Sequence, residues 1–331
     1  MNELNTIRIP LLIFMMIQNY KEKGVYYEKI VILLLGIVSL LAGMGKVQAA
    51  AAVKVTDSLG TELVFEQTPE RVVVLGYSEY DTLKALGLEE LVVGAPKKNV
   101  PAYLGALPKK ITDIGSLKEP NLETIAELAP DLIIATGRTA ALAEELKQIA
   151  PVFVNRLDNV NFWESFKSTN LNLATIFNQT EKAEAVITSL EEKVEQVKQT
   201  VADQNQTTLV LMLNEGNLSA FSANSRFALI YQVLGFKAVD DSIEDGTHGQ
   251  EVSYEGILSL NPERIFYLDR TAAIGGDKTK NADFLTNELI AQTTASQNDA
   301  INALTSDLWY LTGGGLESLS LQIDEIEAFI Q

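Results

Sequence analysis

A segment of twenty residues occurs twice in this chain, and this repeat constrains the fold more than any other feature of the sequence. Residues 119–138 match residues 251–270 at a constant offset of 132 positions, with seven identical residues. Each copy has the pattern of a short amphipathic helix, a proline that ends it, and a β-rich run. Each copy closes on an arginine, Arg138 or Arg270, at the predicted carboxyl end of the strand. Because ligands of open α/β sheets bind at that edge, we expect two similar lobes that enclose a cleft for an anion.

The first half of the chain has the pattern of a parallel sheet covered by helices. Residues 71–75, 91–94, 131–135 and 151–154 are strand-like, and they alternate with helix-like segments such as 79–86. This alternation is typical of consecutive βαβ units. In the second half, residues 207–213 and 264–268 are predicted strands, and residues 227–234 and 316–330 are predicted helices.

A long helix is predicted between the two halves. Residues 161–203 carry no strand signal, and Asn178, three residues before Glu181, is a predicted N-cap. About 22 helical residues would reach roughly 33 Å, which fits either a packing helix or a stiff strut between two lobes, and we favour the strut. Its apolar stripe consists of Ala183, Val186, Ile187, Leu190, Val194, Val197 and Val201.

The predicted fold class is therefore α/β, with two Rossmann-like lobes that have parallel sheets and are joined by a single long interdomain helix. Residues 50–165 are the expected N-terminal lobe, 166–203 the connecting helix region and 204–331 the C-terminal lobe. A rigid helical connection favours limited hinge motion over wide opening and closing.

The first 49 residues have the features of an export signal. An apolar run at residues 30–44 follows Lys29, and small residues before Ala50 suit cleavage by signal peptidase. The run is short for a membrane span. We therefore expect the protein to be exported and residues 1–49 to be a signal segment.

Composition excludes several classes of partner and site. Five of the 26 basic and three of the 44 acidic residues lie in residues 1–49, so the remaining chain has 21 basic and 41 acidic residues and a formal charge of −20. So acidic a surface repels nucleic acid and anionic lipid. The chain has no cysteine and one histidine, which excludes a cysteine nucleophile, a thiolate metal site and a zinc site with several histidines.

Three arginines are candidates for binding an anion. Arg138 and Arg270 follow buried strands, and Arg226 lies where a loop turns into a helix, where backbone N–H groups also favour an anion. A single arginine is more commonly a solvated charge or half of a salt bridge. Three of them at strand and helix ends of so acidic a chain favour an anion site.

His248 and Tyr310 are candidates for binding a metal ion. His248 lies in a loop before the second repeat, and Tyr310 is predicted at the end of a strand-like run, before three glycines. Each residue taken alone is more commonly structural. Together an imidazole and a phenolate suit a hard ion of high charge such as Fe(III).

Glu123 and Glu255 occupy the same position in the two repeats, each near the start of a predicted helix. They are either acids that suit the helix dipole or two symmetric carboxylates able to contact a two-fold partner.

Several motifs together resemble the substrate-binding proteins of iron-siderophore ABC importers, and among these the proteins for catecholates such as petrobactin and enterobactin. The resemblance extends over residues 53–330 and implies a type III periplasmic-binding-protein-like fold, with two lobes joined by a long helix. The motifs that carry it are residues 113–123, 131–134, 225–227, 246–249, 268–270, 309–311 and 315–318.

The resemblance also implies roles for the candidate residues. The three arginines would bind the anionic ferric complex, with Lys98 as a fourth cation. Residues His248 and Tyr310 would ligate iron when the siderophore supplies only two catecholates. The glutamates Glu123 and Glu255 would dock on arginines of the ABC permease dimer.

The function that we expect is therefore binding and delivery, without catalysis. The protein would be a monomeric extracytoplasmic receptor for a ferric catecholate siderophore, with no cofactor of its own and Fe(III) entering as part of the siderophore complex. Lipoproteins of this group carry an acylated cysteine where this chain has Met44, so a lipid anchor at that site is not available.

Other functions stay open from the sequence. A receptor of the same fold could bind cobalamin, haem or a ferric hydroxamate, although hydroxamate complexes carry less negative charge and suit three arginines less well. A hydrolase would need His248 and an unidentified serine, because no Gly-x-Ser-x-Gly motif is present. A permease-associated interaction module without a small ligand is the third alternative.

Overall fold

Residues 52–246 and 248–331 are described by the structure, a computed structural model. The predicted signal segment, residues 1–49, lies outside this range, as does Met44. Within the described residues, no helix is long and apolar enough to cross a membrane.

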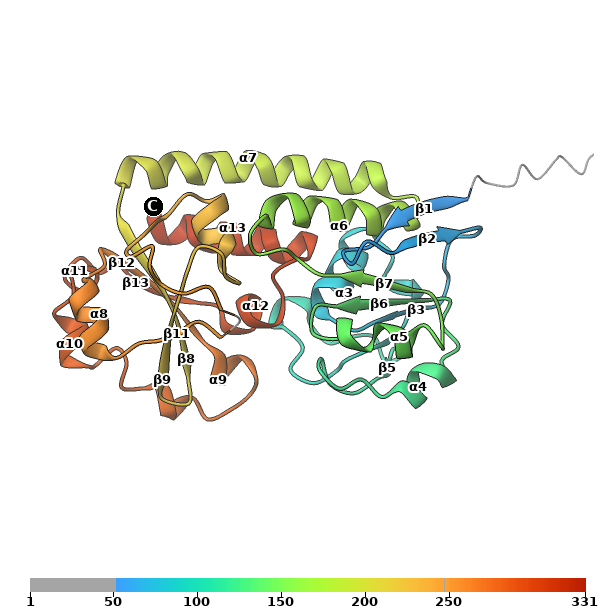
Figure 1. Ribbon diagram of the computed structural model, residues 1–331, viewed down its shortest axis with the longest axis horizontal. Helices are drawn as coiled ribbons and strands as arrows, with labels where there is room; N and C mark the ends of the chain where they lie inside the picture. Colours follow the sequence, from blue (N-terminus) through green and yellow to red (C-terminus); the bar gives the residue numbers. More distant parts are fainter. Residues whose placement is uncertain (1–51, 247) are drawn as a thin grey trace, which may run out of the picture. The chain divides into compact units, whose positions relative to one another are not determined.

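The first sheet is fully parallel, as predicted, and has the strand order β5-β4-β3-β6-β7 (Figure 1). Its central strands β3 and β6 are buried along their whole length, which explains their unbroken apolar sequence. A hairpin of β1 and β2 precedes this sheet and was not predicted. The strands are β1 (Val53–Thr56), β2 (Glu62–Phe65), β3 (Val72–Val74), β4 (Val92–Ala95), β5 (Thr112–Asp113), β6 (Leu132–Thr136) and β7 (Val152–Asn155).

Short helices connect these strands. The helix predicted at residues 79–86 is α3, which begins two residues earlier, at Tyr77, and ends at Ala85, two residues before Gly87, whose φ is +76°. The helices of this part are α3 (Tyr77–Ala85), α4 (Leu122–Glu127) and α5 (Ala143–Leu146), with single 3-10 turns at Glu89–Leu91, Ala102–Leu104 and Ala140–Leu142.

The second sheet is mixed, which differs from the predicted parallel sheet. Strands β8, β12 and β13 are parallel neighbours, but β9 runs antiparallel to β8 and β11 antiparallel to β9. A two-residue turn at Glu215 and Gly216, both with positive φ, reverses the chain after β8 and so produces the hairpin. The strands are β8 (Thr207–Asn214), β9 (Asn217–Phe221), β10 (Lys237–Ala238), β11 (Gln250–Glu251), β12 (Arg264–Asp269) and β13 (Ile301–Leu304).

The helices of this second part are mostly short. The segment predicted as a helix at residues 227–234 is a π-helical turn, Leu229–Val233, and a 3-10 turn covers Lys278–Asn281. The α-helices are α8 (Tyr254–Leu260), α9 (Arg270–Ala273), α10 (Glu288–Ala291), α11 (Thr294–Gln297), α12 (Ser306–Leu311) and α13 (Leu316–Ile330).

Two helices, not one, lie between the sheets. Helix α6 (Phe162–Ile176) precedes the long helix α7 (Thr180–Gln204), and α7 packs along both α6 and α13 (Figure 1). The predicted apolar stripe of α7 is confirmed, because all its residues are buried except the half-buried Val186.

The predicted N-cap of the long helix was wrong. Asn178 has φ +56° and lies in the turn after α6, a conformation that asparagine tolerates, and its side chain donates to Thr68. The exact lobe boundaries at residues 165/166 and 203/204 stay predictions.

A buried aspartate of α3 caps the last helix of the chain. The Asp81 carboxylate accepts hydrogen bonds from the backbone N–H groups of Glu317 (2.8 Å) and Ser318 (2.7 Å), in the first turn of α13. It also accepts a bond from the Tyr103 hydroxyl (3.0 Å). A Cβ at Gly315 would overlap the carboxylate, which explains one of the three glycines before α13. These contacts fix α13 directly to the N-terminal part of the chain.

Replacing Asp81 with alanine is expected to lower the free energy of unfolding by about 3 kcal/mol, because a helix cap is lost and three buried or partly buried donors lose their acceptor. Asp324→Ala is the matched control, since it removes only the half-exposed ion pair with Lys193 and should change stability by about 1 kcal/mol or less. Urea denaturation of both variants measures the difference. Equal midpoints for the two variants would contradict this role of Asp81.

Candidate functional site

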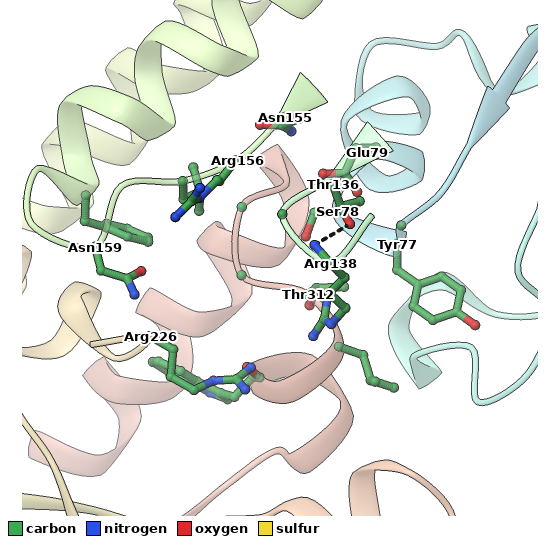
Figure 2. A pocket seen from close by; sticks show the side chains of 18 of the residues that line it. Tyr77, Ser78, Glu79, Thr136, Arg138, Asn155, Arg156, Asn159, Arg226 and Thr312 are labelled. Carbon is green, nitrogen blue, oxygen red and sulfur yellow. Dashed lines mark hydrogen bonds between the residues drawn. The ribbon is translucent and has the colours of Figure 1, made fainter. Parts of the chain in front are cut away.

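An open cavity lies where the ends of three strands of the first sheet face α12 and the segment after it (Figure 2). The void measures about 820 Å³, including the open solvent at its mouth. Its walls come from segments far apart in the sequence, including residues 76–79, 136–138, 155–157 and 311–314.

The first wall is built at the carboxyl edge of the parallel sheet. Strands β3, β6 and β7 are neighbours, and the residues directly after each of them line the cavity. Gly76 and the start of α3 follow β3, Arg138 follows β6, and Arg156 follows β7. Parallel strands bring these three connections to one edge, which is where open α/β sheets bind ligands.

Arg156 was missed by the sequence analysis. Its position shortly after a predicted strand, residues 151–154, is the same signal that identified Arg138 and Arg270. It was overlooked because residues 151–154 lie outside the repeat. The side chain is exposed and also lines an adjoining cavity with Ser58, Asp158 and Asn159.

The opposite wall contains Arg226 and Trp309. Arg226 follows β9, and its guanidinium donates to the backbone carbonyls of Trp309 (3.2 Å) and Tyr310 (2.9 Å). Its Nε is buried and has no hydrogen-bond partner among the described residues. Trp309 is a buried residue of α12 that also lines the cavity.

Tyr310 joins the three predicted arginines. Its backbone carbonyl accepts from both Arg138 and Arg226 at 2.9 Å, and its hydroxyl accepts from Nε of Arg270 at 2.8 Å. The Arg226 guanidinium lies 4.4 Å from the centre of the Tyr310 ring, and that of Arg270 lies 5.4 Å from it. The prediction that Tyr310 ends a strand was wrong. It lies in α12, since a short apolar run does not distinguish a strand from a buried helix.

The charges of this cluster shift two pKa values. Burial, and next the charge of Arg138, lower the pKa of Arg226 to about 10, against the opposing effect of Tyr310. For Tyr310, burial raises the pKa, but the hydrogen bond and charge of Arg270 and the charges of Arg226 and Arg138 outweigh it, so its pKa is lowered. A phenolate is therefore easier to form here than at an ordinary tyrosine.

The phenolate absorbance of Tyr310 is expected to appear at a lower pH than that of a free tyrosine, whose pKa is about 10. The difference between the titration curves of the wild type and Tyr310→Phe isolates this one group. Arg270→Gln should move the curve back to higher pH, because it removes the hydrogen bond and the charge that favour the phenolate. A Tyr310 curve at or above the ordinary pKa would contradict the assignment.

Two other predicted residues lie away from the cavity lining. Lys98 is exposed, and its backbone carbonyl accepts a hydrogen bond from the Tyr77 hydroxyl at 2.5 Å. His248 is exposed and precedes β11. Arg270 and Tyr310 do not line the cavity themselves, but Tyr310 follows the lining residue Trp309, and Arg270 bonds to Tyr310 and to Asn214 of β8.

Glu123 and Glu255 occupy matching places. Each is the second residue of its helix, α4 or α8, and each side chain is exposed. The side chain before each helix accepts a hydrogen bond from the third N–H group of that helix. Asn121 Oδ1 accepts from Thr124 at 3.0 Å, and Ser253 Oγ accepts from Gly256 at 3.1 Å. The repeat thus produces two equivalent helix starts, each presenting a carboxylate to solvent.

Within the described residues, no group of three or more histidine, aspartate or glutamate side chains is placed to hold a metal ion. Among the residues that line the cavity, Glu79 supplies a carboxylate.

Comparison with known proteins gives the family. A model of the family described as periplasmic binding protein matches residues 72–308. The petrobactin-binding protein YclQ of Bacillus subtilis is 38% identical over 272 residues, which cover 82% of this chain and 85% of YclQ.

Solved structures agree. The iron uptake ABC transporter substrate-binding protein PiuA of Streptococcus pneumoniae superimposes with a TM-score of 0.81 and 42% identity, over 83% of this chain and 97% of PiuA. The catecholate-siderophore binding protein VctP of Vibrio cholerae gives a TM-score of 0.78 and 30% identity, over 84% of this chain and 99% of VctP. The predicted fold class, of the type III periplasmic-binding-protein kind, is confirmed, and the chain belongs to the periplasmic binding protein family.

Proposed function

We propose that this protein binds a ferric catecholate siderophore outside the cytoplasm and delivers it to an ABC importer for iron uptake. The relatives support the cargo class, since YclQ is named for petrobactin and VctP for catecholate siderophores. Membership in a family of binding proteins also supports a role in which the protein binds its cargo and catalyses no reaction.

The arrangement of arginines around Tyr310 is the observation that carries the proposal. Arg138, Arg226 and Arg270 all bond to one residue, and the buried Nε of Arg226 has no acceptor among residues 52–246 and 248–331. Three catecholates around Fe³⁺ have a net charge of −3, which three guanidiniums can balance. Arg156 adds a fourth cation at the lining, a place that we had expected Lys98 to fill.

Tyr310 is the proposed protein ligand to iron. Its lowered pKa favours the phenolate, which is the form that binds Fe(III). His248 is the proposed second ligand when the siderophore supplies only two catecholates. Iron then belongs to the cargo, and the two side chains complete its coordination.

The matching exposed carboxylates on α4 and α8 support docking on a two-fold permease. A permease dimer offers the same contact twice, and the internal repeat supplies the two carboxylates that fit it. A single copy of this chain is sufficient for that contact.

Calorimetric titrations with a ferric catecholate, haem and cobalamin test the cargo class. We expect one ferric catecholate per protein molecule and an affinity that falls as salt is added, because charge pairing drives binding. Tighter binding of haem or cobalamin than of the ferric catecholate would overturn the proposal.

A further inference from the structure

Arg270, the first residue of α9, is held by two side chains, neither of which is a carboxylate. Its Nε donates to the Tyr310 hydroxyl at 2.8 Å, and its Nη1 donates to Asn214 Oδ1 at 2.6 Å. Leu213 of β8 is the register partner of Asp269 in the parallel strand β12. The residues that follow them, Asn214 and Arg270, therefore lie side by side. Because a guanidinium is planar, two bonds from different nitrogens fix the direction in which its other N–H groups point.

Two carboxylates close to this contact in the sequence have other partners. Asp269 accepts from a backbone N–H of α9, as its cap, and from Nδ2 of Asn281 at 2.8 Å. Glu215 pairs with Lys280 at 3.5 Å. In the described part of the chain, no carboxylate forms an ion pair with Arg270. The positive charge of Arg270 is therefore not neutralised by any of these side chains.

The turn after β8 is fastened to the segment that begins with α9. The backbone N–H of Glu215 donates to Thr271 Oγ1 at 2.8 Å, and that of Gly216 donates to Asn281 Oδ1 at 2.9 Å. These two bonds hold the end of β8 against this segment without any contribution from the side chain of Asn214. Its hydrogen bond with α9 is therefore not required to keep the two segments together.

Stability alone does not explain an asparagine at position 214. An aspartate there would have nearly the same shape and would accept the same hydrogen bond, now between two charged groups, which is the stronger kind. It would also neutralise the guanidinium and so weaken the attraction of Arg270 for an anion. An amide oxygen instead orients the guanidinium and leaves its charge available to a ligand.

We propose that Asn214 is a positioning residue of the anion site, whose amide oxygen orients the Arg270 guanidinium toward Tyr310 and leaves its charge free to attract the cargo. Asn214 acts through Arg270, because its side-chain oxygen is the acceptor of an Arg270 donor. This inference rests on the proposed function and adds to it the residue that determines how much positive charge Arg270 presents to a ferric catecholate.

Substitutions at position 214 distinguish this role from a purely structural one. Asn214→Asp keeps the shape and the acceptor but adds a charge, and it is expected to weaken the binding of a ferric tris-catecholate about tenfold or more, as loss of one charge-assisted contact would. Asn214→Ala removes the acceptor but leaves the charge of Arg270, so a smaller loss of about threefold is expected. A structural role predicts the opposite order, because aspartate preserves the hydrogen bond and alanine does not. Calorimetric titration measures the affinities.

A matched control and a salt series complete the experiment. Asn217→Asp makes the same change of charge at an exposed residue on the other side of the turn, and it should leave the affinity within about twofold because solvent and salt screen that site. The affinity of Asn214→Asp should fall less steeply than that of the wild type as salt is added, because less unpaired positive charge attracts the cargo. An equally steep fall in the two proteins would overturn the positioning role.

The outcomes separate the two proposals. Equal affinities of the wild type and Asn214→Asp, a greater loss in Asn214→Ala than in Asn214→Asp, or an equal loss in Asn217→Asp would each overturn the positioning role alone. Failure of the wild type to bind the ferric tris-catecholate overturns the proposed function and the positioning role with it. If Asn214→Asp does not fold, Asn214→Ala is measured again in an Arg270→Gln background. Its effect on affinity should disappear there, and an undiminished effect overturns the positioning role.

Discussion

Arg226→Glu is expected to weaken the binding of a ferric catecholate by about 100-fold or more. Two charge-assisted hydrogen bonds hold the guanidinium against the carbonyls of Trp309 and Tyr310, and its buried Nε, which has no acceptor in the described part of the chain, is available to a ligand. Loss of such a contact is worth about 1.5 to 3 kcal/mol, and the reversed charge adds repulsion of the anionic complex. A tryptophan-quenching titration measures the change.

Two control variants distinguish the effect of the Arg226 charge from other effects of the substitution. Lys54→Glu makes the same change of charge at an exposed residue of β1, and it should leave the affinity within about twofold because solvent and salt screen that site. Arg226→Lys keeps the charge but lacks the planar guanidinium with its several N–H donors, so an intermediate loss of affinity is expected. Unchanged affinity in Arg226→Glu, with an unaltered unfolding transition, would remove Arg226 from the site.

Iron uptake is expected to fall about tenfold or more in the double variant Glu123→Ala/Glu255→Ala, while siderophore affinity stays unchanged. Both carboxylates are exposed and lie at equivalent helix starts, and neither lines the cavity. Losing two charged contacts with the permease should weaken docking by at least 1.4 kcal/mol, about a factor of ten. Uptake of a radiolabelled ferric catecholate by cells measures the effect.

Matched alanine substitutions are available for this experiment. Glu127 and Glu251 are also exposed, the first at the end of α4 and the second in β11. Glu127→Ala/Glu251→Ala removes the same charge from nearby positions and should leave uptake normal. Normal uptake by Glu123→Ala/Glu255→Ala would refute docking through these residues.

The sequence predicted the parts of the fold that depend on local pattern. The buried strands of the first sheet are continuous apolar runs, and the stripe of α7 repeats every three to four residues, so each could be recognised without knowledge of its neighbours. The hairpin of β8 and β9 was not predicted, because it depends on two positive φ angles at Glu215 and Gly216.

Of the candidate site, the sequence predicted only the residues that the ends of predicted elements indicate. Arg138 and Arg270 were found because the repeat marks them, and Arg156 was missed because its strand lies outside the repeat. The gathering of arginines around Tyr310 could not be predicted, since their contacts span between 40 and 172 positions of sequence. Glu79 carried no signal beyond that of an ordinary acid in the first turn of a helix.

The most direct measurement is a fluorescence-quenching titration with a ferric bis-catecholate, a ferric tris-catecholate and a ferric hydroxamate. Of the two tryptophans in the chain, Trp309 lines the cavity and adjoins Tyr310, so it should report binding. We predict saturable quenching by the two catecholates and not by the hydroxamate, with the bis-catecholate bound more weakly by His248→Ala. Quenching by none of the three, or by the hydroxamate alone, would contradict a ferric catecholate receptor.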